Sequence, residues 1–346
     1  MREINRGIIV TGGTIGSIAQ GDGAKVIHNE RASESLSRQQ EEQKDIVDIA
    51  IITVLEDEFR AALQRFKTEY RNTPGGLSYY MSRAQTWDAR ETTIAITRSS
   101  EQGNDASQKL AGDIIRELNP RLILVVGIAG GVPHDDFTLG DVIVSTRVLN
   151  FNVDAQNADG TITVSARGGS HPVVSQISAL LPGEDGRLAG WNERSSIGQE
   201  RPGIDLQRVQ AYINGDNAWR DKVWQSLHQH FSKTQQRQPL FRTGHIASSN
   251  HLMKNPVLLA QWLTMNRGIL AVEMETAGVY EAAQTLNHQY PVMAIRGISD
   301  IVGLSRDGLW AAYACQTAAA FAHAFILTDP LKQIPRSQID GNNGMY

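Results

Sequence analysis

Length, composition and charge exclude several classes of protein. The chain has 346 residues, of which 41% are hydrophobic and 20% charged, so it can bury the core of a large globular domain. Its net charge is −4 and it has no long block of Lys or Arg, so a nucleic-acid partner held through phosphates is not expected. The single cysteine, Cys315, excludes a disulfide framework and a zinc site of thiolates. A small-molecule substrate fits better, and no cofactor or metal ion is expected.

Hydropathy argues against a membrane protein. No stretch approaches the roughly 18 apolar residues that a membrane helix needs. The start of the chain, Met1 to Asn5, lacks the basic-then-apolar plan of a signal peptide. We therefore expect a cytoplasmic protein without a membrane partner.

The first 45 residues differ in composition from the rest of the chain. Residues 7–27 are rich in glycine, with β-branched residues between the glycines and almost no charge, and residues 28–45 are polar and charged. The leader is similar to short Gly-rich β-forming motifs that precede effector domains in some bacterial and fungal signalling proteins, where like motifs pair in cross-β fashion. We interpret residues 1–45 as a leader and polar linker, in which residues 7–27 either bind a homotypic partner or are disordered.

A short motif in the leader suggests another enzyme class. Thr11-Gly12-Gly13-Thr14 resembles the nucleophile motif of bacterial asparaginases. No later segment supplies the His-Gly-Thr-Asp sequence with which those enzymes activate the threonine. No Gly-Lys-Ser/Thr follows the glycines either, so the segment is not a P-loop. We set both classes aside.

Residues 46–328 show the pattern of an α/β domain. The apolar run at residues 47–54 predicts a buried strand, and a helix should follow from residue 56 to about residue 66. Further strands are predicted at residues 93–97, 122–127, 142–148, 269–273 and 292–296. Further helices are predicted near residues 106–118, 257–264, 276–286 and 308–327. Strands that alternate with helices predict a mainly parallel sheet covered on both faces.

Two segments depart from this alternation. Residues 183–240 are polar at first and then amphipathic around Trp219 and Trp224, which predicts an insertion that carries one or two helices. Residues 329–346 predict a disordered tail.

Acidic residues follow several of the predicted strands. Glu58 ends a run of three acids after the first strand, where the helix dipole also favours negative charge. Glu273 and Glu275 point to the same side where a strand gives way to a helix. Asp300 lies among aliphatic residues just past another strand. Acids buried at strand ends are costly without partners, so a functional role is favoured over packing.

The order of these motifs resembles that of one protein family. The Gly-rich turn that closes the strand at 122–127 would let a ligand lie against the backbone. Six segments follow the order used by the nucleoside phosphorylase superfamily: residues 49–54 with Glu56-Asp57-Glu58, Gln102-Gly103-Asn104, Gly127-Ile128-Ala129-Gly130-Gly131, Leu139-Gly140-Asp141-Val142-Ile143-Val144, Val272-Glu273-Met274-Glu275 and Arg296-Gly297-Ile298-Ser299-Asp300. The chain is most similar to methylthioadenosine/S-adenosylhomocysteine nucleosidases and to related domains of bacterial and fungal signalling proteins.

The resemblance implies a phosphorylase/hydrolase-like three-layer α/β fold, with a central mixed, mainly parallel twisted sheet flanked by helices. It implies a purine nucleosidase in which Asp300, as general acid, protonates the base and Glu58 activates the attacking water. Glu275 would accept hydrogen bonds from the ribose hydroxyls. The other substrate-binding residues that it implies are Met274 under the sugar, Ser299 beside the general acid, and Glu273, Ala129, Gly130, Leu252, Met253 and Arg98.

The nucleophile and the substrate stay open at this point. A phosphorylase needs an anion site after the first strand, where this chain has three acids that would repel phosphate. Arg98, after the second strand, could bind phosphate, bind the 5′-phosphate of a nucleotide or form a surface ion pair. Leu252 stands where such nucleosidases stack an aromatic ring on the purine, and Phe151 or Phe241 could substitute for it. Water is favoured as nucleophile, phosphorolysis is the alternative, and nucleosides, nucleotides and dinucleotides of adenosine type are all candidate substrates.

Assembly is a further open question. By resemblance we expect a homo-oligomer, because pockets in this family are commonly completed by a neighbouring subunit. One hypothesis is a signalling or defence effector recruited through residues 7–27. A signalling or assembly module that only binds nucleosides is disfavoured, since all three carboxylates are present.

Overall fold

The computed structural model describes residues 47–151, 154–156, 162–164, 167–233, 237–250, 256–285 and 289–334. All of them belong to the unit Asp45–Tyr346. The leader at residues 1–45 lies outside the described residues, and so do Leu252 and Met253. None of the helices in the described part is long and apolar enough to cross a membrane.

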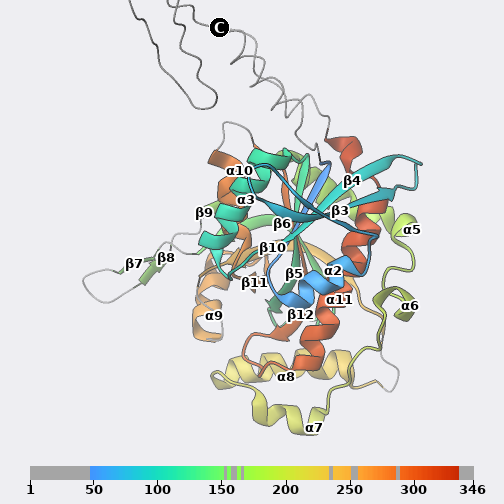
Figure 1. The fold of residues 1–346 in the computed structure, drawn as a ribbon. Helices are drawn as coiled ribbons and strands as arrows, with labels where there is room; N and C mark the ends of the chain where they lie inside the picture. The colour runs from blue at the N-terminus through green and yellow to red at the C-terminus, as the bar shows by residue number, and fades with distance from the viewer. Residues whose placement is uncertain are drawn as a thin grey trace, which may run out of the picture. The chain divides into compact units, whose positions relative to one another are not determined.

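A ten-stranded mixed sheet forms the centre of the fold (Figure 1). Its strands are β1 (Ile49–Thr53), β2 (Glu69–Asn72), β3 (Ser78–Gln85), β4 (Glu91–Arg98), β5 (Leu122–Gly131), β6 (Val142–Asn150), β9 (Arg167–Gly169), β10 (Phe241–Ser248), β11 (Ile269–Glu273) and β12 (Val292–Ile301). They lie in the order β11-β10-β6-β12-β5-β1-β4-β3-β2, with β9 paired to β6. Because β11 also pairs with β5, part of the sheet closes on itself. A separate two-stranded sheet joins β7 (Asp154–Gln156) and β8 (Ile162–Val164).

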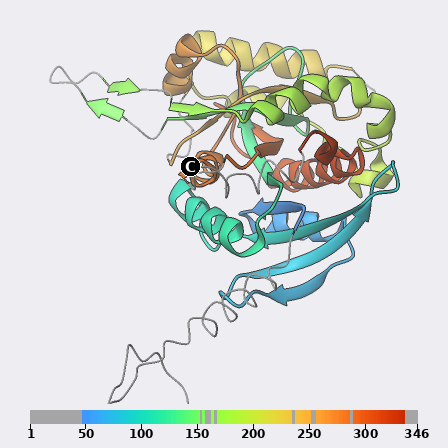
Figure 2. The same cartoon turned by 90° about the horizontal axis from the view of Figure 1, so that it is seen from above.

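Helices cover both faces of this sheet. The α-helices are α2 (Glu56–Leu63), α3 (Asn104–Leu118), α4 (Pro172–Leu180), α5 (Asp185–Leu188), α6 (Arg194–Ile197), α7 (Leu206–Val209), α8 (Asn217–Phe231), α9 (Pro256–Met265), α10 (Thr276–Thr285) and α11 (Gly308–Leu327). Short 3-10 helices are η1 (Leu181–Glu184), η2 (Gln210–Tyr212) and η3 (Pro330–Gln333). Helices α3 and α10 pack side by side, while α11 packs against β5 and β12 on the other face (Figure 2).

Successive side chains of a strand point to opposite faces of the sheet and thereby form two cores. Every residue of β1 is buried. Ala50 and Ile52 belong to the core beneath α3 and α10, whereas Ile49 and Ile51 belong to the core beneath α4 and α11. Burying one large apolar side chain contributes about 1.5–3 kcal/mol, so a strand buried on both faces must be apolar throughout. This is why the predicted strands read as continuous apolar runs.

The sheet combines both strand directions. β1 pairs in parallel with β4 and β5, and β12 pairs in parallel with β5. β12 runs antiparallel to β6, and β2, β3 and β4 form an antiparallel edge. The predicted α/β fold with a mixed sheet between helices is confirmed, and β11 and α11 have the predicted bounds.

Several elements have no counterpart in the sequence prediction, among them β2, β3, α4 and β10. The strands β2 and β3 lie at an exposed edge, where residues such as Tyr70 need not be buried. In β10 the first half is only partly buried and includes Arg242 and Gly244, so it lacks an apolar run. A half-buried strand gives a weaker pattern than a strand covered on both faces.

Two local predictions are wrong. The described part of residues 183–240 contains α5, α6, α7 and α8 rather than one or two helices, because three of them are single turns, too short to show periodicity. The Gly-rich segment 127–131 is not a turn but the end of β5, where Gly130 and Gly131 pair with β11. Glycine serves close packing here rather than a change of direction.

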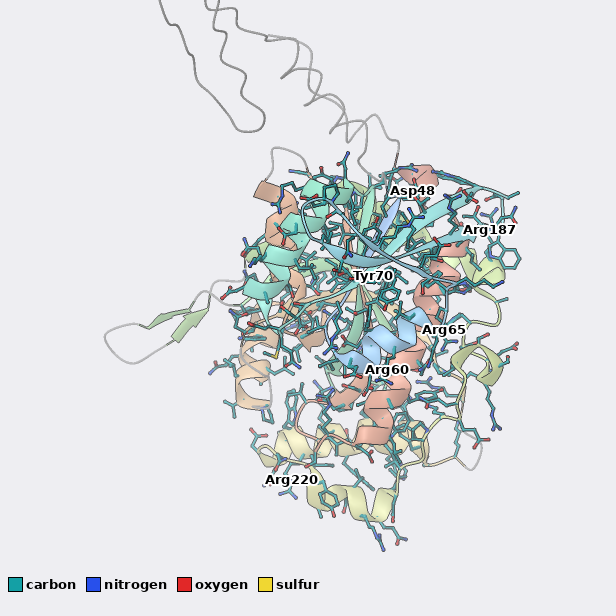
Figure 3. All side chains as sticks on the ribbon, viewed as in Figure 1. Asp48, Arg60, Arg65, Tyr70, Arg187 and Arg220 are labelled. Atoms are coloured by element: carbon teal, nitrogen blue, oxygen red, sulfur yellow. The ribbon has the colours of Figure 1, made fainter. Side chains whose placement is uncertain are left out.

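Residues 329–334, which the sequence prediction places in a disordered tail, pack onto the domain. Buried Arg121 donates hydrogen bonds to the carbonyl oxygens of Leu331 (2.9 Å) and Ile334. The same guanidinium pairs with Asp48 just before β1 (Nη1 to Oδ1, 3.3 Å). Figure 3 labels Asp48. The contact with Leu331 joins residues 210 positions apart, which local composition cannot reveal.

Candidate active site

A pocket lies where the carboxyl ends of β1, β5, β11 and β12 come together. The predicted site residues that line it are Glu58, Ala129, Gly130, Glu273, Met274, Glu275, Ser299 and Asp300. The other lining residues are Val54, Leu55, Gln102, Ile128, Val272 and Arg306. Residues that follow neighbouring strands meet at one edge of a sheet, so acids distant in sequence face one cavity.

Glu58 is held by the backbone at the start of α2. Its Oε2 accepts hydrogen bonds from the N–H groups of Val54 (2.9 Å) and Leu55 (2.8 Å), and its Oε1 accepts one from Ile128 (2.9 Å). The bond to Leu55, the residue before the helix, is one half of a capping box. Glu58 therefore joins the end of β1 to β5 while its carboxylate faces the pocket.

Glu273 organises the turn from β11 into α10. Its Oε2 accepts hydrogen bonds from the backbone N–H groups of Glu275 (3.1 Å) and Thr276 (3.0 Å) and from the Thr276 hydroxyl (2.7 Å). The same oxygen forms a buried ion pair with Arg296. Glu273 lines the pocket, but these contacts occupy its carboxylate.

The guanidinium of Arg296 is fully buried beside the two glutamates. Burial lowers its pKa, but the carboxylates of Glu273, Glu275 and Glu58 raise it by more, so the group keeps its charge. Its Nε and Nη1 have no hydrogen-bond partner among the described residues. Arg296 has no role in the sequence prediction, although a charged residue within an apolar strand is a signal that could have identified it.

Glu275 has one carboxylate oxygen to which no described residue donates a hydrogen bond. Its Oε2 lies 3.5 Å from Nη2 of Arg296 and accepts a long hydrogen bond from the N–H of Met274 (3.3 Å), and no described residue donates to its Oε1. Burial, together with the charges of Glu273 and Glu58, raises the pKa of Glu275 to about 7, although Arg296 acts in the opposite direction. Near neutral pH the side chain thus exchanges between an acceptor and a protonated form.

Two glycines of β5 make room for these charged groups. A Cβ on Gly127 would lie 2.4 Å from Oε1 of Glu58 and 2.6 Å from Nη1 of Arg296. A Cβ on Gly130 would lie 3.3 Å from Oδ2 of Asp300. At Gly127 no larger residue fits without moving the acid or the arginine.

Asp300 is directed into the pocket by an irregularity of β12. The pairing of β12 with β5 shifts register between Ile298 and Asp300, and such bulges turn side chains in a new direction. The Ser299 hydroxyl lies 2.6 Å from Oδ1 of Asp300 and 3.3 Å from the carbonyl oxygen of Ala129. Ser299 thus holds the carboxyl group against β5.

Some of the predicted site residues lie elsewhere. Arg98 is exposed and does not line the pocket; its Nε donates a hydrogen bond to the carbonyl oxygen of Val54 (3.0 Å). Phe151 is stacked on Trp262 in the core, with ring centroids 4.1 Å apart. Phe241 packs against Phe321 on the α11 side of the sheet. Neither phenylalanine is among the described residues that line the pocket.

No group of three or more His, Cys, Asp or Glu side chains is arranged to hold a metal ion in the part of the chain that the structure describes.

Carboxylates that converge on one pocket at the edge of a mixed α/β sheet define a candidate enzyme of the α/β class. Residues 48–327 match the phosphorylase superfamily, and the chain belongs to this superfamily. The resemblance to it that the sequence motifs indicated is confirmed.

Curated relatives cover most of the chain. The ATP nucleosidase Cap17 of Escherichia coli (strain KTE188) is 25% identical over 292 residues, which are 82% of this chain and 51% of that protein. A death domain-containing ATP nucleosidase of Amphimedon queenslandica is 21% identical over 299 residues, which are 80% of this chain and 47% of that protein. The chain thus spans about half the length of the curated relatives that it matches.

Solved structures share the fold. The 5′-methylthioadenosine/S-adenosylhomocysteine nucleosidase of Neisseria meningitidis has a TM-score of 0.53 and 17% identity, over 82% of this chain and 100% of that chain. The futalosine hydrolase of Helicobacter pylori strain 26695 has a TM-score of 0.52 and 19% identity, over 81% of this chain and 97% of that chain.

The role of Gly127 can be tested by adding one methyl group. We expect Gly127→Ala to lower the free energy of unfolding by about 1–3 kcal/mol, because the new Cβ overlaps Glu58 and Arg296. The control is Gly112→Ala in α3, where a Cβ meets no atom and should stabilise the helix by about 0.5–1 kcal/mol. The measurement is urea unfolding. Equal effects of the two substitutions would show that β5 has room at position 127.

Ionisation of Glu275 should cost stability. Its pKa is raised in the folded state, so the folded protein holds this proton more tightly and loses stability as the pH rises from 4.5 through about 7. We expect Glu275→Gln to raise the free energy of unfolding by about 3 kcal/mol at about pH 8.5 and to leave it unchanged at about pH 4.

The control for this experiment is Glu69→Gln on the exposed strand β2, which should change the free energy of unfolding by less than about 1 kcal/mol. A gain for Glu275→Gln that is the same at both pH values would contradict the raised pKa.

Proposed function

We propose that this chain is a purine nucleosidase, which hydrolyses the N-glycosidic bond of an adenosine-type nucleoside or nucleotide. The observation that carries the proposal is the convergence of Glu58, Glu275 and Asp300 on one pocket. The names of the relatives support it, since both curated relatives are ATP nucleosidases and the solved neighbours are a nucleosidase and a hydrolase.

The leaving group needs a proton. A purine anion leaves the sugar poorly, so Asp300 donates its proton to the base as the bond to the anomeric carbon breaks. Ser299, 2.6 Å from Oδ1, fixes the direction of the carboxyl group. The Oε1 oxygen of Glu275, to which no described residue donates, accepts hydrogen bonds from the ribose hydroxyls. These bonds hold the sugar while positive charge develops on the sugar.

The attacking water needs a base. A carboxylate has about four acceptor positions, and backbone N–H groups use three of those of Glu58. The remaining position accepts the proton of the water molecule whose oxygen bonds to the anomeric carbon. The products are the free base and the hydrolysed sugar.

The contacts of Glu58 also favour water over phosphate. The N–H groups of Val54, Leu55 and Ile128 could bind an anion at this place, but the Glu58 carboxylate already occupies them. A phosphate ion here would meet a buried negative charge instead of donors. Arg98, the candidate phosphate ligand, lies outside the pocket lining.

Asp300→Asn tests the proposed acid. We expect the release of adenine to fall by about 10²–10⁴-fold, because the amide cannot protonate the base, while substrate binding is largely kept. Base release from adenosine, AMP and ATP is measured by chromatography, with and without inorganic phosphate. Asp113→Asn, on the surface of α3, is the control and should keep full activity. Base release that requires phosphate would show a phosphorylase instead.

We also propose that the chain forms a homo-oligomer and that residues 7–27 recruit it into a larger assembly in which it acts as an effector. Deleting residues 1–30 should then lower both the particle size in solution and the specific activity, and deleting residues 335–346 should change neither. Unchanged size and activity after the first deletion would contradict recruitment through the leader.

A further inference from the structure

Arg306 is the only Lys or Arg among the described residues that line the pocket. It lies in the loop between β12 and α11, six positions after Asp300, and its side chain is exposed. No described carboxylate forms an ion pair with it. The guanidinium is thus available to a ligand at the pocket mouth.

The rest of the pocket repels anions. Four carboxyl groups line it, those of Glu58, Glu273, Glu275 and Asp300. The buried guanidinium of Arg296 is already matched by Glu273 and Glu275. Among the described residues that line the pocket, Arg306 alone therefore attracts an anionic group of a substrate.

The loop that carries Arg306 is held in place by the segment 212–219, which belongs to the insertion. Hydrogen bonds and a β-bridge join the two segments. The indole N–H of Trp219 donates to the Val302 carbonyl oxygen (2.9 Å), and the backbone N–H of Asn214 donates to that of Gly303 (2.6 Å). The backbone N–H of Ser305 donates to the Tyr212 carbonyl oxygen (3.2 Å), and Ile213 forms a β-bridge with Leu304. Gly303 has a φ of +96°, and a Cβ there would lie 2.6 Å from Nε1 of Trp219. The insertion thus shapes the loop that connects Asp300 to Arg306.

We propose that Arg306 forms an anion subsite that binds the 5′-phosphate groups of a nucleotide, and that the segment 212–219 positions it. The proposal rests on the proposed function and names its substrate class. Asp300 meets the base and Glu275 the ribose hydroxyls, so the 5′-carbon is the remaining point from which a substituent reaches the mouth. Guanidinium groups bind phosphate oxygens through paired charge-assisted hydrogen bonds.

The test compares ATP, AMP and adenosine as substrates of the full-length chain. We compare Arg306→Ala with the wild-type protein. The factor by which kcat/KM for ATP falls should be about 10 to 100 times the factor for adenosine. Arg306→Lys keeps the charge and should recover part of the loss. The matched control is Arg220→Ala, an exposed arginine on α8 (Figure 3), which should leave all three values unchanged.

The positioning role of the insertion has its own variant. Trp219→Phe keeps a buried ring but removes the N–H that binds the Val302 carbonyl. We expect KM for ATP to rise by about 3- to 10-fold while kcat for adenosine changes little. Trp224→Phe, on the same helix, is the control and should change neither value.

The outcomes separate this proposal from the proposed function. If the wild-type protein releases adenine from adenosine but not from nucleotides, only the proposal of an anion subsite is overturned. An equal loss for ATP and adenosine in Arg306→Ala does the same, because it would show a structural role for the arginine. If the wild-type protein releases base from none of the three substrates, both proposals fail.

Discussion

The buried ion pairing of Arg296 with Glu273 and Glu275 is the interaction on which the site depends. These carboxylates are close together and largely removed from water. If no positive charge lay beside them, they would repel one another and take up protons. Glu273 accepts from Arg296 and also from the backbone of the turn into α10, so the same carboxylate sets the shape of that turn. Removing the guanidinium of Arg296 would leave the glutamates as uncompensated buried charges, which typically costs about 3–5 kcal/mol. Burial, together with the neighbouring charges, raises the pKa of Glu275 to about 7.

The acids that we propose as catalytic groups also hold elements of the fold together. Glu58 holds the start of α2 against β5 through three backbone N–H groups, and those bonds also orient its carboxylate. Asp300 owes its direction to a bulge in β12 and to the hydroxyl of Ser299. The glycines of β5 let both acids approach the backbone. A site built this way is rigid, because each acid is fixed by the elements that form the sheet edge.

The insertion supports the loop that follows the pocket residue Asp300, although it lies far from that loop in sequence. Segment 212–219 adds hydrogen bonds and a β-bridge to the loop that follows Asp300. Helix α8, which begins in this segment, packs Val223 and Leu227 into the same core as α3 and α10. The loop that follows Asp300 is thereby held against a packed helix instead of being surrounded by solvent.

The α/β class, the buried strands and the acids at the strand ends could be predicted from the sequence, because each of these depends on a local pattern of apolar and charged residues. The resemblance to the superfamily implied that Glu58, Glu275 and Asp300 share one site. The balance of the glutamates by Arg296 and the hydrogen bond from Trp219 to a carbonyl group 83 residues away became visible only in the folded structure. Such contacts join backbone and side-chain atoms whose positions depend on how the elements pack, and no local pattern encodes that packing.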